Sequence, residues 1–249
     1  MLPFGVTRSS VQRDHAMIAS DSHVQAVLPG WTNAKGIILI SPAMGARFVQ
    51  YFALMQPGAK AGPPAPGMQR FVYVMDGAVK VSGGGVNGEL KPGGYAYFPA
   101  GAEHSIESSG ESKLLLIEKR FTKLAGGTPP RAIIGREQDI ASAAFMGDEA
   151  AQLKNLLPDE PGYDIAVNIF AYAPGGMLPF VEVHIMEHGL IMLDGMGVYR
   201  LSESWYPVAA GDVIWMAPYC AQWFVAGGKT WSRYLYYKDV NRDAMVVET

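Results

Sequence analysis

The sequence predicts an all-β protein built from two tandem barrels of similar design. Glycine (29 residues) and proline (17 residues) interrupt the chain at short intervals and leave many short runs rich in Val, Ile, Phe and Tyr. Short strands separated by regular turn signals are typical of sandwiches and barrels. Glycines also recur in the same order at one fixed offset, which indicates an internal repeat. The length of 249 residues accommodates two domains of about 100–120 residues each.

The expected strands follow one another along the whole chain. They are RFVYVMDGAVKVSG (70–83), GGYAYFPAG (93–101), KLLLIEKRF (113–121), YDIAVNIFAYAP (163–174), GLIMLDGMGVYRL (189–201), DVIWMAP (212–218) and TWSRYLYYKD (230–239). β-branched and aromatic residues favour strands over helices. One short helix is expected at EAAQLKNLLP (149–158), which stops at Pro158 because proline cannot continue a helix.

The repeat relates the two halves of the chain by an offset of 118 residues. Gly58, Gly77, Gly93 and His104 precede Gly176, Gly195, Gly211 and Gln222 by this distance. The surrounding sequence agrees with this offset, since VMDGAVKV matches LDGMGVYRL. Several matches in order at one offset indicate a duplicated domain. We place the boundary in the Gly/Pro-rich stretch LAGGTPPRAIIG, which gives an N-terminal barrel over residues 1–125 and a C-terminal barrel over residues 126–249.

Composition excludes several classes of protein. The net charge is −3 and no Lys/Arg block occurs, so we expect neither a nucleic-acid nor an anionic-membrane partner. No run of 18 apolar residues suggests a transmembrane helix, and the first residues lack the apolar core of a signal peptide. A cytoplasmic location is therefore the default expectation. The single cysteine, Cys220, excludes an internal disulfide and a cysteine-based zinc cage, and we expect it to be a small, partly buried apolar residue.

The stretch FVEVHIMEHG concentrates candidate metal ligands. Glu182, His184 and His188 lie within seven positions of a chain that has only 5 histidines. Residues i and i+2 of a strand face the same side, so Glu182 and His184 can both point into a barrel. His188 comes within reach if the chain bends near Met186 and Glu187. We expect Glu187 itself to face away from the site, where it is solvated or ion-paired.

Gln222 is the candidate for a fourth ligand because the repeat aligns it with His104. Two imidazoles, one carboxylate and one amide oxygen form a mixed nitrogen and oxygen shell. Such a shell suits Mn(II), Fe(II) or Zn(II), and ligand type alone does not choose among them. It also leaves positions for water or substrate on a six-coordinate ion.

The first half lacks a comparable set of ligands. The offset maps Glu182, His184 and His188 onto Pro64, Pro66 and Arg70, which leaves only His104. We therefore expect a metal-free N-terminal barrel with a structural or assembly role. Because broad apolar sheets commonly pair, a homo-oligomer is expected.

The last expected strand adds further candidates for the pocket. Tyr234 and Lys238 share one strand parity, and if this parity faces inward, both line the metal pocket. A lysine there is a candidate proton donor or acceptor, or a clamp for a substrate carboxylate. The alternative is a surface lysine paired with Asp239. Tyr199 is a second candidate for the lining, with ordinary cross-strand packing as its alternative.

The glycine frame around these residues resembles the two-part signature of the cupin superfamily, small jelly-roll barrels with a metal in the mouth. The usual signature is G-x5-H-x-H-x3,4-E-x6-G followed by G-x5-P-x-G-x2-H. Here glutamate takes the place of the first histidine, His188 that of the glutamate, and Gln222 that of the last histidine. In the first half, Gly93-x5-Pro99-x-Gly101-x2-His104 matches the second part well. This resemblance implies a bicupin, with two jelly-roll barrels (double-stranded β-helices) in one chain.

A narrower resemblance comes from E-V-H-x3-H-G, LDGMGVY, GD-x-I-W-M-x5-Q and the terminal YYKDVNRD. Together with the early segment ILISPAMGARFVQY, these motifs are similar to the (S)-ureidoglycine aminohydrolase family. The resemblance covers most of the chain and implies a metal-dependent C–N hydrolase of purine (allantoin) breakdown. It would release ammonia from (S)-ureidoglycine to give (S)-ureidoglycolate, with Mn(II) bound.

The same resemblance implies roles for individual residues. Glu182, His184, His188 and Gln222 would be the metal ligands. Tyr234 and Lys238 would contact the substrate together with Glu182 and Gln222, and Tyr199 is a further substrate-binding candidate. Lys238 and Glu182 are the candidate catalytic groups.

Two other functions remain open because the cupin fold hosts many activities. One is a different metal-dependent cupin enzyme, such as an Fe(II) dioxygenase, which oxygen consumption would reveal. The other is a non-catalytic bicupin that binds a small molecule, which would show ligand binding without turnover.

Overall fold

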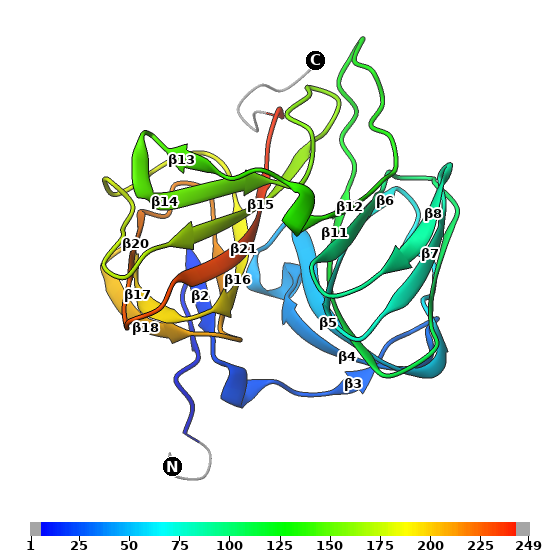
Figure 1. Cartoon of the computed structure of the whole chain (residues 1–249), viewed down its shortest axis with the longest axis horizontal. Helices are drawn as coiled ribbons and strands as arrows, with labels where there is room; N and C mark the ends of the chain where they lie inside the picture. The colour runs from blue at the N-terminus through cyan, green and yellow to red at the C-terminus, as the bar shows by residue number, and fades with distance from the viewer. Residues whose placement is uncertain (1–5, 243–249) are drawn as a thin grey trace. The chain divides into compact units, whose positions relative to one another are not determined.

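The computed structural model describes residues 6–242, which form two compact β units joined in one chain (Figure 1). Of the described residues, 24–43 and 47–140 form the N-terminal barrel, and 6–23, 44–46 and 141–242 form the C-terminal barrel. Both units consist of strands with three single-turn 3-10 helices between them. The predicted all-β class is therefore confirmed. Among residues 6–242, no helix is long and apolar enough to cross a membrane.

The N-terminal barrel is one ten-stranded sheet in the order β12-β9-β6-β11-β5-β10-β7-β8, with β4 paired to β5 and β3 paired to β4. Its strands are β3 (Ala26–Val27), β4 (Thr32–Ile40), β5 (Phe48–Lys60), β6 (Met68–Asp76), β7 (Val79–Gly83), β8 (Val86–Leu90), β9 (Gly94–Phe98), β10 (His104–Ser108), β11 (Ser112–Arg120) and β12 (Ile133–Arg136). The 3-10 helix η2 (Pro42–Met44) precedes β5, and η3 (Glu137–Asp139) follows β12.

The C-terminal barrel contains an eight-stranded sheet in the order β1-β2-β19-β16-β21-β15-β14-β13 and a three-stranded sheet in the order β18-β17-β20. Its strands are β1 (Ser10–Val11), β2 (His15–Ile18), β13 (Ala143–Phe145), β14 (Asp148–Asn155), β15 (Ile165–Tyr172), β16 (His188–Asp194), β17 (Met196–Leu201), β18 (Ser204–Ala209), β19 (Val213–Met216), β20 (Gln222–Ala226) and β21 (Ser232–Asp239). The 3-10 helix η1 (Ser20–Ser22) follows β2. A core rich in tyrosine, phenylalanine and methionine fills this unit.

The internal repeat is visible in the strands themselves. β6 and β16 end 118 residues apart at Asp76 and Asp194, and β10 and β20 begin 118 residues apart at His104 and Gln222. The glycine that follows each aspartate is in the left-handed region, with φ of 74° in both barrels. At Gly195 a Cβ atom would also lie 2.7 Å from the Cα of Ser232, so only glycine fits this turn. The repeated glycines thus mark equivalent tight turns.

The unit boundaries differ from the expected ranges 1–125 and 126–249 at both ends of the first domain. Residues 126–140 lie in the N-terminal barrel, where β12 pairs with β9. Residues 6–23 lie in the C-terminal barrel, where β2 pairs with β19. The two segments correspond at the offset of 118, because β2 (His15–Ile18) maps onto β12 (Ile133–Arg136). Each of these strands pairs with a strand of the barrel that it does not directly precede in the sequence, and the repeat alone does not predict this exchange.

The helix expected over residues 149–158 is wrong. This segment forms most of β14, which pairs with β13 on one side and β15 on the other. Ala151 is fully buried in the barrel core. Pairing with two neighbouring strands outweighs the helical propensity of Ala, Gln, Leu and Lys in a segment this short.

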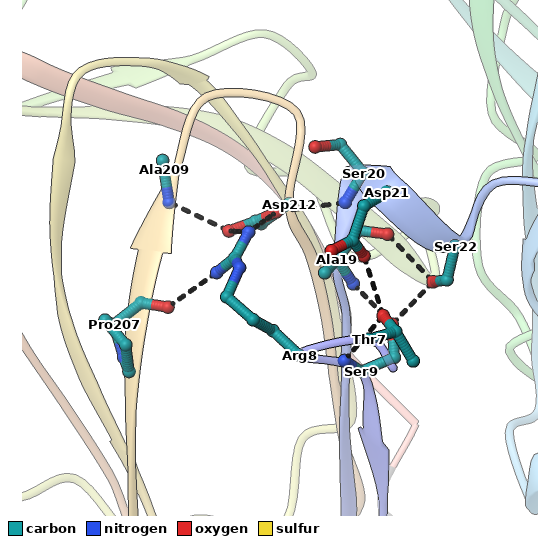
Figure 2. Close-up of polar contacts among 10 residues, drawn as sticks. All are labelled: Thr7, Arg8, Ser9, Ala19, Ser20, Asp21, Ser22, Pro207, Ala209 and Asp212. Atoms are coloured by element: carbon teal, nitrogen blue, oxygen red, sulfur yellow. Dashed lines mark hydrogen bonds and ion pairs between the residues drawn. The ribbon is translucent and has the colours of Figure 1, made fainter. Parts of the chain in front are cut away.

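Residues 7–23 form a strap that extends the large sheet of the C-terminal barrel. In Figure 1 the blue strand β2 lies among the yellow to red strands, and Met17 pairs with Ile214 of β19. The fully buried carboxylate of Asp212 fastens the strap. It accepts hydrogen bonds from Arg8 Nη2 at 2.9 and 3.0 Å, from the Ser20 backbone N–H at 3.1 Å and from the Ala209 backbone N–H at 2.9 Å (Figure 2). Arg8 Nη1 also donates to the Pro207 carbonyl at 3.1 Å.

The ion pair between Arg8 and the buried Asp212 predicts that mutation of Arg8 destabilises the C-terminal barrel. Arg8→Ala should lower the free energy of unfolding of the C-terminal barrel by about 1–3 kcal/mol, because Asp212 would stay buried without its cation. Urea denaturation and hydrogen exchange of the strap amides would measure the loss. Lys60→Ala is the control, since it removes an ion pair with Glu107 that is exposed on both sides and should cost less than about 1 kcal/mol. Equal losses in the two variants would contradict the special role of Arg8.

Candidate metal centre

The C-terminal barrel encloses a cavity of about 160 Å³ that collects every site residue predicted from the sequence. The predicted members of its lining are Glu182, His184, His188, Tyr199, Gln222, Tyr234 and Lys238. The remaining members are Phe145, Phe170, Met186, Leu190 and Tyr236. Polar groups therefore converge on one side of a space that is otherwise walled by apolar and aromatic side chains.

Backbone pairing sets two of the candidate ligands side by side. The Glu182 N–H donates to the Gln222 carbonyl and the Gln222 N–H donates to the Glu182 carbonyl, each at 2.9 Å. Residues paired in this way across an antiparallel bridge project their side chains to the same face. Only this isolated bridge, not a regular strand, holds Glu182. Val181 and Val183 nevertheless alternate with it and are exposed, which matches the predicted strand-like alternation.

Three separations between candidate ligand atoms suit one shared cation, whereas Glu182, His184 and His188, all of them described residues, do not all offer ligand atoms within 4.8 Å of one another. The Nε2 atoms of His184 and His188 are 3.2 Å apart, and the Gln222 amide lies 2.8 Å from His184 Nε2. Glu182 Oε2 lies 4.0 Å from the same nitrogen. Ligands about 2.1 Å from one ion at right angles are about 3 Å apart, and opposite ligands are about 4.2 Å apart. The two orientations of the Gln222 amide are not distinguished by its atoms, so rotation by half a turn presents Oε1 to the cavity.

Electrostatics favours the ligand forms of both imidazoles. Burial lowers the pKa of His188 well below its usual value, and His184 and Lys238 lower it further. Burial and then Lys238 lower the pKa of His184. Both rings are therefore neutral near pH 7, and a neutral imidazole has the lone pair that a metal needs. Burial raises the pKa of Glu182, while the charge of Lys238 opposes this shift.

Lys238 lines the cavity, as the inward parity of the last strand requires. Tyr234, Tyr236 and Lys238 alternate along β21, and all three belong to the lining. His188 and Lys238 are partners across β16 and β21. The alternative of a surface pair with Asp239 is not what the structure has, because Asp239 is buried and accepts a hydrogen bond from the Glu187 backbone N–H at 2.6 Å.

The tyrosines supply uncharged hydrogen-bond donors around the cavity. Tyr199 donates to Gln222 Oε1 at 3.4 Å, and the hydroxyls of Tyr172 and Tyr234 lie 3.1 Å apart. Burial raises the pKa of Tyr199 and of Tyr234. Both phenols therefore stay protonated and can donate to a bound anion.

Two contacts of the site escaped the sequence analysis. Asn168 donates to the Tyr236 hydroxyl at 3.0 Å, and the Tyr236 ring stacks on His188 with centroids 5.7 Å apart. Tyr236 shares the parity of Tyr234 and Lys238, which was a usable signal. Asn168 is a buried polar residue inside the apolar run YDIAVNIFAYAP, and this was its only signal.

The expectation for Glu187 needs correction in part. Its side chain is not part of the cavity lining, as expected, but it is fully buried rather than solvated. Its carboxylate accepts a hydrogen bond from Trp215 Nε1 at 2.9 Å. Glu187 occupies the bend between the irregular segment and β16, where the side chain turns into the protein.

The N-terminal barrel places a guanidinium where the repeat equates Arg70 with His188. Arg70 is 1% exposed and donates to the Gly62 carbonyl at 2.9 Å and to Glu118 at 2.7 Å. Its Nη1 lies 3.1 Å from His104 Nε2. A guanidinium is permanently charged, so Arg70 would repel a divalent cation at this position. It also occupies His104 Nε2, the nitrogen with which His104 would bind a metal.

Asp14, His15 and Cys220 form a second group with one ligand atom each within 4.8 Å of one another. These atoms already have protein partners. His15 Nδ1 bonds Asp14 at 2.9 Å and His15 Nε2 bonds the Tyr206 hydroxyl at 2.9 Å. Cys220 is buried, as expected, and its sulfur lies 3.7 Å from Ser202 Oγ. This group is a hydrogen-bonded cluster beside the cavity rather than part of its lining.

Comparison with known proteins places this geometry in context. A family model described as a cupin domain matches residues 51–118. A rice protein (Oryza sativa subsp. japonica) named probable (S)-ureidoglycine aminohydrolase is 44% identical over 97% of this chain and 78% of its own. The (S)-ureidoglycine aminohydrolase of Escherichia coli K12 is 32% identical over 93% and 90% of the two chains. The crystal structure of protein Ylba from E. coli superposes with a TM-score of 0.85 at 30% identity, over 98% of this chain and 97% of that one.

The lowered histidine pKa values predict how the metal-free protein responds to pH. A folded-state pKa below the usual 6.5 means that the unfolded chain binds protons first as pH falls, so stability drops below about pH 6.5. A buried histidine contributes up to about 1.4 kcal/mol per pH unit there. Urea unfolding with chelator at about pH 7.5 and about pH 5.5 should therefore show a shallower loss for His188→Leu than for the wild type. Equal losses in the two proteins would show that His188 binds protons equally in the folded and the unfolded chain, which would contradict its lowered pKa.

Proposed function

The chain belongs to the (S)-ureidoglycine aminohydrolase family of cupin proteins, and from this premise we propose that it releases ammonia from (S)-ureidoglycine with a bound divalent metal ion. The product would be (S)-ureidoglycolate, in the breakdown of allantoin and other purine products. The observation that carries the proposal is the convergence of two neutral imidazoles, a carboxylate and an amide on one small cavity.

Mn(II) is the metal we propose, held by Glu182, His184, His188 and Gln222. Oxygen and imidazole donors suit a borderline or hard divalent ion, and Fe(II) and Zn(II) share this preference. A bound ion would act as a Lewis acid and as a template that anchors the substrate. The hydrolysis needs no redox change, so a metal that is hard to oxidise is sufficient.

The cavity fits the size and polarity of the substrate. Its volume of about 160 Å³ is below the ~300–1,000 Å³ typical of pockets for drug-sized ligands, so it suits a small molecule. (S)-Ureidoglycine has a carboxylate, an amine and a ureido group on one carbon. The ammonium of Lys238 can pair with the carboxylate, and the phenols of Tyr199 and Tyr234 can donate to its oxygens.

The reaction breaks the bond from the central carbon to the amine nitrogen and forms a bond from the same carbon to a water oxygen. The amine takes a proton as it leaves as ammonia, and the water loses one. Lys238 is positioned either to hold the carboxylate or to supply the proton to the amine. Glu182 faces the same cavity and is the second candidate for proton transfer.

Removing one candidate ligand should abolish metal binding and activity together. His188→Ala should bind no more than a trace of Mn(II) and should release no ammonia from freshly generated (S)-ureidoglycine. Metal analysis and an ammonia assay on the same preparation measure both quantities, with chelator and Mn(II) add-back on the wild type as the reference. Full ammonia release by the chelated wild type would contradict the metal requirement, and oxygen consumption would favour a dioxygenase instead.

Lys238 should matter for turnover but not for the metal. Lys238→Met should retain Mn(II) and lose at least about 100-fold in kcat, the usual minimum for a lost general acid or base. Lys229→Met is the matched control, because Lys229 is exposed in the turn before β21 and should leave kcat unchanged. Wild-type turnover by Lys238→Met would remove Lys238 from the proposed site.

A further inference from the structure

The strap of residues 7–23 contacts the turn of residues 217–221, which directly precedes the proposed ligand Gln222 and bonds the backbone of the proposed ligand His184. From these contacts we propose that Asp14 is a positioning residue for the metal centre, acting through Ser202 and the turn of residues 217–221 on Gln222 and His184. The inference rests on the ligand set proposed above and adds to it a group from the opposite end of the chain.

The turn of residues 217–221 is tied to both ligands. The Tyr219 backbone N–H donates to the carbonyl of His184 at 2.8 Å, and Gln222 follows the turn directly as the first residue of β20. On its other side the turn is tied to the strap, because the Ala217 N–H donates to the Asp14 carbonyl at 2.9 Å. A displacement of the turn would therefore move two candidate ligands at once.

The Asp14 side chain adds a second tie through Ser202. Ser202 Oγ donates to Asp14 Oδ2, and the Ser202 backbone N–H donates to the carbonyl of Ala221 at 2.7 Å. Ala221 is the residue immediately before Gln222. The carboxylate of Asp14 thus connects to the backbone next to a proposed ligand through one intervening residue.

Two non-glycine residues of this network are in the left-handed region of backbone space. Ser202 has φ of 51° and Tyr219 has φ of 64°. Such residues are uncommon and persist where surrounding contacts fix them. Ser202 lies in the two-residue hairpin turn between β17 and β18, where a positive φ is common, and its side chain bonds Asp14. Tyr219 lies in the turn of residues 217–221 and bonds the His184 carbonyl.

The strap also lies one strand away from His188. Met216 of β19 pairs with His15 of the strap on one side and with His188 of β16 on the other. His15 is 2% exposed and bonds Asp14 through Nδ1 and Tyr206 through Nε2. His15 therefore orients the Asp14 carboxylate toward Ser202, and the strap supports the strand next to the third ligand.

The strap has a separate attachment for stability, which makes the proposal testable. Arg8, Ser20 and Asp212 fasten the open end of the β1–β2 hairpin (Figure 2). Asp14 lies at the tip of this hairpin and contacts the ligand-bearing turn. Loss of a group that orients a metal ligand weakens metal affinity by about 10–100-fold in known metal sites. A group with a purely structural role lowers the melting temperature without this change in affinity.

The experiment measures the affinity of the metal-free full-length protein for Mn(II) alone, and its melting temperature without metal. Asp14→Ala and Ser202→Ala should each weaken Mn(II) binding by about 10–100-fold. The double variant should bind Mn(II) as tightly as the single variant with the lower affinity, because both substitutions remove the same interaction. Asp14→Asn keeps a hydrogen-bonding group toward Ser202 and should recover most of the affinity. Asp21→Ala is the matched control, since Asp21 is an exposed strap carboxylate that accepts a hydrogen bond from Thr7 (Figure 2), and this variant should bind Mn(II) like the wild type.

Four results would decide against the proposal. Wild-type Mn(II) affinity in Asp14→Ala or Ser202→Ala would overturn it, even with a lower melting temperature. Additive losses in the double variant would show that the two residues act separately. A second equivalent of metal, retained by His188→Ala and lost by Asp14→Ala, would make the Asp14, His15 and Cys220 cluster an ion site of its own. Absence of Mn(II) binding by the wild type would overturn the proposed centre itself, and this inference with it. If Asp14→Ala does not fold, Ser202→Ala carries the same test.

Discussion

The paired backbone hydrogen bonds between Glu182 and Gln222 are the constraint on which the candidate metal centre depends. The segment that carries Glu182 and His184 is irregular, and this pair attaches it to β20 of the barrel. Without the attachment, a carboxylate and an imidazole would sit on a loop with little to orient them. With it, both groups share with His188 and Lys238 a cavity whose remaining walls are aromatic and apolar. The local geometry of one short bridge therefore decides where the polar groups of the whole site meet.

The two barrels solve the same physical problem in different ways. Each has polar groups that converge inside an apolar barrel, and buried polar groups need partners. The N-terminal barrel satisfies His104 and Glu118 with the permanent charge of Arg70. In the C-terminal barrel the equivalent position is His188, whose neutral ring can share a cation with its neighbours. The two halves of the repeat differ at all four equivalent positions, with Pro64, Pro66, Arg70 and His104 in the first half and Glu182, His184, His188 and Gln222 in the second.

Local periodicity and the repeat predicted the barrels and the candidate ligands. For Tyr234 and Lys238 periodicity predicted only that they share a face, and the family resemblance implied that this face lines the cavity. The parity of Lys238 and the alternation around Glu182 were readable for the same reason. The strand at residues 148–155 was not, since its pairing with β13 and β15 depends on residues far from it in sequence. The burial of Glu187 and the position of Asn168 behind Tyr236 are likewise products of tertiary packing. The predicted homo-oligomer concerns contacts between chains and stays a prediction.

The strap has a consequence for how the molecule is made and how it can be divided. The C-terminal barrel is not a continuous piece of sequence, because its sheet includes β2, which precedes the N-terminal barrel in the chain. During synthesis this segment emerges well before β19 and has to stay unpaired until β19 has been made, and contacts so distant in sequence form slowly. A fragment that starts at the linker between the barrels would leave β19 as an open sheet edge, and such edges promote aggregation. A cut in the sequence between the two barrels therefore does not separate the two structural units, because residues 6–23 belong to the C-terminal barrel.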